Sequence, residues 1–292
     1  MRRAVPLILG PILLLSFAPQ AYAADTFVRH VIRTWQWATP SPDPTGLDFL
    51  PSGQLLVTDS EVDEVPVNEG RNVWRITRGG RVERTMSTYR FSHEPTDVAV
   101  DGGHGVWYFS SDVGARIFVV NLGPDGSYGT PDDSRRYFST SSFGSRDPEG
   151  LAYGGGSLWI SDGKNEKIYR IRPGANGRFD GAETDDIITS RSLRDLEVRN
   201  VEGVEYAPNG HLYVLPGTKN PDLLEFNFAS GSVVRTYDLS AARLKRPSAV
   251  AYGPSSVDPT RRSFYIADRG VDNSANPDEN DGRIVELGVQ AN

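Results

Sequence analysis

Oxygen-bearing side chains recur at two fixed places in a motif that the sequence repeats five times. One place directly precedes the Pro or Val that starts each copy, and its members, here called the outer set, are Asp43, Glu94, Asp147, Asn200 and Arg246. The other place lies two residues later, and its members, the inner set, are Thr45, Thr96, Glu149, Glu202 and Ser248. Carboxylate and amide oxygens are hard ligands that suit calcium better than zinc. If the copies converge in space, the outer set apart from Arg246 predicts the ligands of a calcium site.

Turn capping is the alternative explanation for these acids. Asp and Asn commonly cap turns before proline, which would account for Asp43 or Asp147 alone. It accounts less well for Glu94, Glu149 and Glu202. Carboxylates crowded in this way repel one another unless a cation lies among them. We therefore favour a metal site at this place.

The same residues predict a catalytic role beside the metal. Glu149 or Glu202 would activate water as a general base, and Arg246, together with Arg269, would bind an anionic group of a substrate. His93 is a further candidate base, although a lone histidine is more often structural. No nucleophile elbow, phosphate loop or cysteine occurs in the sequence.

A regular spacing of short strands must position these residues. The motif starts recur about every 50 residues, at Pro44, Pro95, Pro148, Val201 and Pro247. Each unit has room for four short apolar strands separated by Gly, Asn and Asp, and no long stretch has helical periodicity. This period predicts an all-β fold, a five-bladed β-propeller. Six blades are the alternative, and a β-sandwich is a weaker rival because it requires no such period.

The N-terminal strand is predicted to close the propeller. The fifth unit lacks a fourth strand before the chain ends at Asn292. The segment Thr26 to Trp37 resembles the fourth strands of other units, and closure would protect exposed sheet edges. First strands line the channel of a propeller, so both sets would surround the channel mouth.

Long loops carry further candidate ligands. Acidic insertions at 58–72 and 267–283 belong to neighbouring blades of the predicted ring. The second contains four oxygen-bearing residues spaced like calcium ligands: Asp272, Asn276, Asp278 and Asn280. A solvated acidic loop explains them equally well. On the opposite face, we interpret the loops 123–133 and 174–186 as structured turns able to hold calcium rather than as catalytic segments.

The first residues have the pattern of a secretory signal peptide. Arg2 and Arg3 precede an apolar run from Ala4 to Phe17, and Ala21-Tyr22-Ala23 matches a cleavage site. A membrane anchor is the alternative, but the run is short and contains two prolines. We expect residues 1–23 to be removed and residues 24–292 to form one domain, secreted or periplasmic.

Composition limits the partners of the 292-residue chain. Its formal charge is −7, which disfavours nucleic acid or an anionic membrane. It has no cysteine and therefore no disulfide, and no second long apolar run predicts a membrane span. We expect a monomer that binds a small molecule or glycan at the channel mouth.

Several motifs resemble known propeller families. "PEGLAY", "LWISDG" and "KIYRI" resemble the NHL and SMP-30/gluconolactonase-like propellers. "GPDGSYGTPDD" and "IADRGVDNSANPDENDGRIVEL" are more similar to exported bacterial propellers of the phytase-esterase-like group. The resemblance covers nearly all of residues 41–287. It implies a propeller, calcium, and hydrolysis of an ester or lactone. It also implies that Asp43, Glu94, Asp147 and Asn200 hold a cation. The chain departs from the SMP-30-like enzymes in two ways: those enzymes have six blades, and Arg246 takes the fifth place of the outer set here.

Three functions remain open from the sequence. The first is a calcium-dependent hydrolase of esters, lactones or phosphoesters. The second is a non-catalytic propeller that binds a protein or glycan, and the third is a lyase. The fold alone does not decide among them, because propellers host both catalysis and binding. An arrangement of base, metal and water in the channel would distinguish the hydrolase from the binding propeller.

Overall fold

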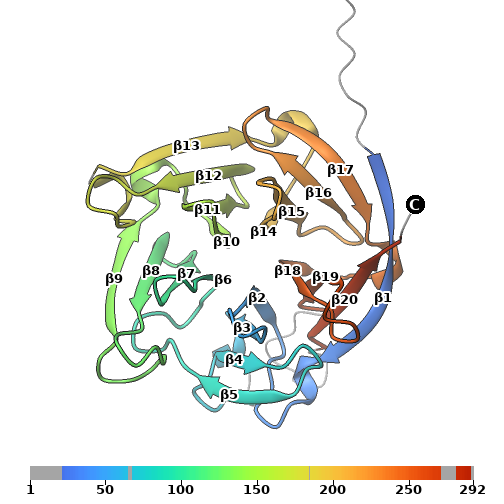
Figure 1. The fold of residues 1–292 in the computed structure, drawn as a ribbon, viewed down its shortest axis with the longest axis horizontal. Helices are drawn as coiled ribbons and strands as arrows, with labels where there is room; N and C mark the ends of the chain where they lie inside the picture. Colours follow the sequence, from blue (N-terminus) through green and yellow to red (C-terminus); the bar gives the residue numbers. More distant parts are fainter. Residues whose placement is uncertain (1–21, 65–67, 184, 271–280, 291–292) are drawn as a thin grey trace, which may run out of the picture.

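The computed structural model describes residues 22–64, 68–183, 185–270 and 281–290. Its strands form three sheets of four strands and one sheet of eight. Figure 1 shows these sheets arranged around a common centre, with β2, β6, β10, β14 and β18 innermost. In the described residues, no helix is long and apolar enough to cross a membrane.

Each four-stranded sheet takes its strands from one repeat, in chain order. The first sheet consists of β2 (Pro44–Phe49), β3 (Leu55–Asp59), β4 (Val73–Ile76) and β5 (Val82–Met86). The second consists of β6 (Asp97–Asp101), β7 (Val106–Ser111), β8 (Arg116–Asn121) and β9 (Ser134–Ser139). The third consists of β10 (Pro148–Gly154), β11 (Ser157–Asp162), β12 (Lys167–Arg172) and β13 (Ile187–Ser192). The repeat of the sequence is therefore a repeat of antiparallel sheets.

The eight-stranded sheet joins the last two repeats through the N-terminal strand. Its order is β14-β15-β16-β17-β1-β20-β19-β18. The bounds are β14 (Val201–Tyr206), β15 (Leu212–Pro216), β16 (Asp222–Asn227), β17 (Ser232–Asp238), β18 (Pro247–Pro254), β19 (Arg262–Asp268), β20 (Arg283–Val289) and β1 (Tyr22–Arg33). Six short 3-10 turns are also described: η1 (Thr34–Gln36), η2 (Val62–Glu64), η3 (Ser141–Phe143), η4 (Gly181–Glu183), η5 (Arg194–Leu196) and η6 (Ser240–Ala242).

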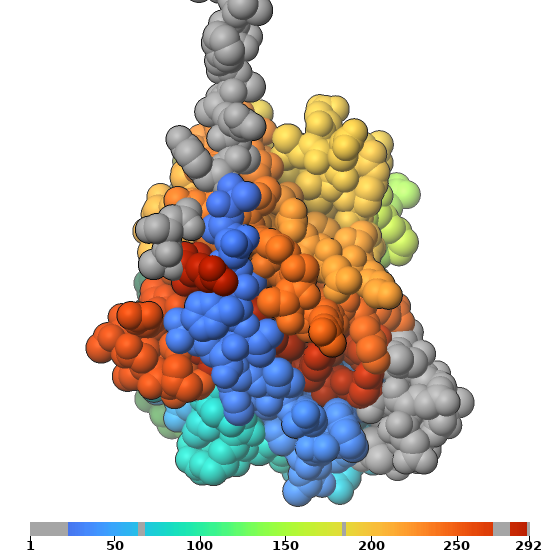
Figure 2. All heavy atoms as spheres, turned by 90° about the vertical axis from the view of Figure 1, so that its right-hand side faces the viewer, coloured from blue at the N-terminus to red at the C-terminus, as the bar shows by residue number. Residues whose placement is uncertain are grey.

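Strand β1 closes the ring, as predicted. It pairs antiparallel with β20 from Thr26 to Arg33, and its first residues pair in parallel with β17. Figure 2 shows the blue N-terminal strand between the orange and red segments of the chain. The fourth place of the last repeat is thus filled by the first strand. The described strands fall into groups that agree with five blades, and the count of five stays a prediction.

The core lies between neighbouring sheets. One cluster packs Leu47, Val57 and Trp74 of the first sheet against Tyr265 and Ile284 of the eight-stranded sheet, and all five side chains are buried. Burial of such side chains contributes about 1.5–3 kcal/mol each. Because this core holds the sheets side by side, the inner ends of their first strands are fixed around the centre.

Candidate functional site

One cavity of about 120 Å³ brings the whole inner set together. It is lined by Thr45, Thr96, Glu149, Glu202 and Ser248, and also by Ser60, Glu61, Glu94, Asp112 and Arg269. The inner set comes from the first strands or their immediate approaches in all five repeats. We call this space the mouth cavity.

Three inner-set hydroxyls link neighbouring repeats. Each donates a hydrogen bond to a main-chain carbonyl of the next repeat. The pairs are Ser248 Oγ with Pro44 O at 2.7 Å, Thr45 Oγ1 with Pro95 O at 3.1 Å, and Thr96 Oγ1 with Pro148 O at 2.9 Å. These three positions therefore have a structural role.

Glu149 and Glu202 depart from that pattern. Their main-chain carbonyls accept hydrogen bonds from Ser110 Oγ at 2.9 Å and Ser161 Oγ at 2.7 Å. Ser161 thus links the third and fourth repeats in place of an inner-set hydroxyl, whereas Ser110 adds to the link that Thr96 makes between the second and third. Among the described residues, neither glutamate carboxylate makes such a link, and both residues line the mouth cavity.

An acidic cluster lies beside Glu149. Carboxylate oxygens of Asp112, Asp147 and Glu149 all lie within 4.8 Å of one another. Lys164 Nζ lies 2.5 Å from Asp147 Oδ1, but the lysine side chain is largely exposed. Calcium binds oxygens at about 2.3–2.6 Å, so two ligands of one ion lie at most about 5 Å apart. The cluster therefore fits a calcium ion.

Burial and like charges raise the pKa of Glu149 to about 9. Desolvation is the largest cause, and the charges of Glu202, Asp147 and Asp112 add to it. Lys164 acts in the opposite direction. The site therefore disfavours full ionisation of its carboxyl groups in the absence of further positive charge.

Glu202 is held by Asn200. Burial raises the pKa of Glu202 to about 7, while a hydrogen bond from Asn200 Nδ2 to its Oε1 at 2.7 Å and the charge of Arg246 lower it. Asn200 has a positive φ of 48°, a conformation that asparagine tolerates better than most residues. Gly217 leaves the space, because a Cβ there would lie 2.2 Å from Cγ of Glu202.

Arg269 forms a second side of the cavity. Its Nε lies 3.7 Å from Asp43 Oδ1, and its Nη2 pairs with Glu61. Its side chain is 15% exposed. Asp43 thus lies beside a guanidinium and is not a member of the Asp112–Asp147–Glu149 cluster.

Aspartates that end second strands fix the main chain of the outer set. Asp59 Oδ2 accepts from the main-chain N–H of Asp43, Asp162 Oδ2 from that of Asp147, and Asp268 Oδ1 from that of Arg246. All three aspartates are fully buried. Turn capping near the outer set is therefore performed by these strand-end residues.

His93 and the four loop candidates lie elsewhere. The His93 side chain is 63% exposed, its Nδ1 lies 3.2 Å from Asp63 Oδ2, and its ring stacks on Tyr89 with centroids 4.6 Å apart. It does not line the mouth cavity, whereas the adjacent Glu94 does. The predicted ligands Asp272, Asn276, Asp278 and Asn280 fall outside the described residues.

Asp112 is the cluster member that sequence reasoning missed. It follows β7 directly, just as Ser60 follows β3 and Arg269 follows β19. Gly163 and Gly217 occupy the same place in the third and fourth repeats. Alignment of the residue after each second strand would have found this third ring of positions.

Comparisons with solved structures identify the fold. The glutaminyl cyclase of Myxococcus xanthus superposes with a TM-score of 0.59 at 15% identity, over 92% of this chain and 98% of that protein. A luciferin-regenerating enzyme gives 0.54 at 12% identity, over 89% and 96%. The aldose sugar dehydrogenase of Streptomyces coelicolor gives 0.50 at 17% identity, over 94% and 100%.

The chain is a β-propeller. The all-β propeller prediction is confirmed, and the mouth cavity lies among the first strands of this propeller. Neither a protein-family model nor a curated protein sequence matches the chain. At these low identities the neighbours establish the fold alone.

Proposed function

We propose that this propeller is an exported, calcium-dependent hydrolase of an ester, lactone or phosphoester. One observation carries the proposal: two members of an all-oxygen cluster, Asp112 and Glu149, line the same small cavity as Glu202, a carboxylate held by an amide. The cluster supplies the place for the ion, and Glu202 supplies the base. The resemblance to SMP-30/gluconolactonase-like and phytase-esterase-like propellers supports the same chemistry.

Asp112, Asp147 and Glu149 would hold the calcium ion. Their oxygens are close enough for one ion. Burial first, and then the neighbouring negative charges, raise the pKa of Glu149, and a bound cation would favour its ionised form. When bound, calcium would supply positive charge that polarises a carbonyl or phosphoryl oxygen. The donor set consists of oxygens, which suits calcium better than zinc.

Glu202 would act as the general base. A pKa of about 7 suits a base that works near neutral pH. Asn200 occupies Oε1, so the other carboxylate oxygen would accept the proton of an attacking water. The water oxygen then bonds to the carbonyl carbon or the phosphorus. The bond to the leaving oxygen breaks, and Glu202 returns its proton to that oxygen.

Two arginines would orient an anionic substrate. Arg269 lines the cavity, where Asp43 and Glu61 hold its guanidinium. Arg246 acts on Glu202 through its charge. We assign both to substrate binding because guanidinium groups recognise carboxylates and phosphates well.

The volume of the cavity favours catalysis over glycan binding inside it. About 120 Å³ holds an ion, a water molecule and a scissile group, but not a saccharide chain. The rest of a larger substrate would lie outside the mouth.

A substrate panel with two variants tests this proposal. We expect the mature protein to hydrolyse at least one chromogenic ester, lactone or phosphoester in calcium, and to lose this activity in excess chelator. Glu202→Gln should lower turnover at least about a hundredfold, as expected for loss of a general base. Glu197→Gln, at an exposed glutamate, is the matched control and should retain it.

Full turnover in Glu202→Gln would exclude Glu202 as the base. Absence of turnover on every substrate class, in calcium and in chelator alike, would favour the binding propeller instead.

A further inference from the structure

A pocket rich in arginine lies between the first and second sheets, apart from the mouth cavity. It has a volume of about 230 Å³ and shares no lining residue with the mouth cavity. Its charged residues come from β5, from β9, from the loop before β9, and from the segments before β4 and after β5. They are Arg71, Arg84, Arg90, Arg135 and Asp133.

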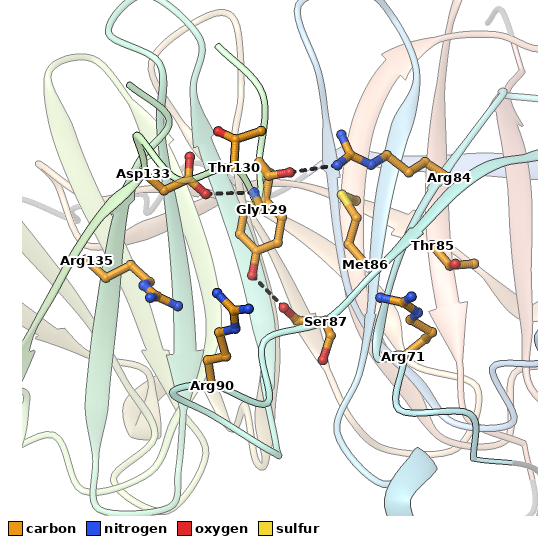
Figure 3. Close-up of a pocket in the computed structure, with 11 residues that line it drawn as sticks. Arg71, Arg84, Thr85, Met86, Ser87, Arg90, Gly129, Thr130, Asp133 and Arg135 are labelled. Atoms are coloured by element: carbon orange, nitrogen blue, oxygen red, sulfur yellow. Dashed lines mark hydrogen bonds between the residues drawn. The ribbon is translucent and has the colours of Figure 1, made fainter. Parts of the chain in front are cut away.

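The arginines point into one space. Figure 3 shows the guanidinium groups of Arg71, Arg84, Arg90 and Arg135 directed toward the gap between β5 and the loop that carries Gly129. Among the described residues, Arg71, Arg90 and Arg135 form no ion pair with a carboxylate. Four arginines opposite one aspartate are unexpected in a chain whose formal charge is −7. Such a concentration of positive charge attracts anions.

The walls of the pocket are firmly packed. Arg84 Nη2 donates to Tyr128 O at 2.9 Å, and Tyr128 Oη donates to Ser87 O at 2.9 Å. The buried Tyr128 ring stacks on Trp107 with centroids 5.1 Å apart. These contacts tie the loop between β8 and β9 to β5. The Arg84 guanidinium is thus held in place by this loop, which limits the ordering cost of binding at that arginine.

Asp133 provides a second determinant. Its Oδ2 accepts a hydrogen bond from the main-chain N–H of Gly129 at 2.6 Å. Its Oδ1 is buried and has no hydrogen-bond partner among the described residues. A buried acceptor without a donor is costly, so a rotation of the Asp133 carboxylate that brings Oδ1 to a ligand hydroxyl in the pocket would be favoured. Inorganic phosphate offers the arginines an oxyanion but no carbon-bound hydroxyl.

We propose that this pocket binds a phosphate or sulfate ester of a small polyhydroxy compound, such as a sugar phosphate. The arginines bind the oxyanion, because planar guanidinium groups match its oxygens in pairs. Asp133 accepts a hydrogen bond from a hydroxyl on the remainder of the ligand. The volume of about 230 Å³ holds the oxyanion and a sugar ring together.

Calorimetric titration at constant ionic strength tests the site. The probes are glucose 6-phosphate, glucose 6-sulfate, inorganic phosphate and glucose. We expect saturable binding of the two esters, weaker binding of inorganic phosphate and none of glucose. Arg90→Gln and Arg135→Gln should each weaken ester binding at least about tenfold, the usual effect of losing one charge-assisted hydrogen bond. Arg172→Gln removes an exposed arginine elsewhere on a strand and should leave it unchanged.

Asp133→Asn separates the two determinants. It removes a negative charge beside the oxyanion, so inorganic phosphate should bind at least as tightly as before. The Gly129 N–H retains the one amide oxygen, so the donor Nδ2 takes the place of Oδ1 and the ester should bind more weakly. Circular dichroism checks that each variant is folded. Absence of saturable binding, or equal losses in the pocket variants and in Arg172→Gln, would overturn the site. Equal responses of ester and phosphate to Asp133→Asn would overturn the assignment to esters.

Discussion

At the scale of single residues, one position of the repeat serves two purposes. Where it carries a hydroxyl, as in Ser248 and Thr96, it ties neighbouring repeats together. Where it carries Glu149, Ser161 on the adjacent strand makes that link instead. The candidate functional residues Glu149 and Glu202 thus stand where the other three repeats carry a hydroxyl. The regular spacing of the repeats makes this difference visible in the sequence.

The space around Glu202 gives a prediction at this scale. A Cβ on Gly217 would lie 2.2 Å from Glu202 Cγ and 2.5 Å from Asn200 Nδ2. Gly217→Ala should therefore displace the base and lower turnover at least about tenfold, since small misplacements of reacting groups are costly. Gly79→Ala adds its methyl group where no atom lies within 4 Å, and should have no effect. Equal turnover in the two variants would show that the position of Glu202 does not matter.

The sequence predicted part of this site. The outer and inner sets follow from the repeat, and Glu94, Glu149 and Glu202 do line one cavity. Asp112 could not be found in the same way, because it lies after the second strand, outside the aligned motif. The exposed position of His93 depends on its stacking with Tyr89 and its contact with Asp63, which no spacing reveals.

At the scale of elements, the pairing between strands determines the bounds of β1, which the sequence pattern leaves open. The spare N-terminal strand was predicted because the last repeat lacked one, and β1 does pair with β20. Its bounds, Tyr22 to Arg33, are set by two partner strands and differ from the predicted Thr26 to Trp37.

The loop 123–133 was predicted as structured. Its carboxylates accept main-chain N–H bonds, such as Ser127 N to Asp125 Oδ1 at 2.7 Å.

Glu225 on β16 gives a prediction of pH dependence. Burial raises its pKa, but hydrogen bonds from His211, Asn209 and Tyr237 outweigh burial and hold the pKa below its usual value. A lowered pKa in the folded state contributes stability above the unfolded pKa of about 4.3, and this stability is lost as the pH falls through the folded pKa. Glu225→Gln should therefore lower the free energy of unfolding by about 1–3 kcal/mol at pH 7.

Denaturant unfolding at several pH values checks this expectation. The difference between wild type and Glu225→Gln should shrink as the pH falls below about 4, and Glu197→Gln should differ little from wild type at any pH. A difference that is constant from pH 7 to pH 3 would show that Glu225 acts without its charge.

At the scale of the whole molecule, ring closure brings distant residues together. Asp43 and Arg269 are far apart in sequence, yet they meet because the first and last repeats are neighbours. The repeat predicted this neighbourhood, but not that Arg269 would reach Asp43 and Glu61. The pairing of long side chains between neighbouring repeats depends on loop conformations, which the sequence pattern does not determine.

Calcium binding tests the central claim most directly. Isothermal titration of the metal-free protein with calcium should show saturable binding, and Glu149→Gln should weaken it at least about tenfold because one charged ligand is lost. Glu197→Gln serves as the control and should bind calcium as the wild type does. If the wild type binds no calcium, or if Glu149→Gln binds it equally well, the mouth cavity is not the metal site and the account of its chemistry is wrong.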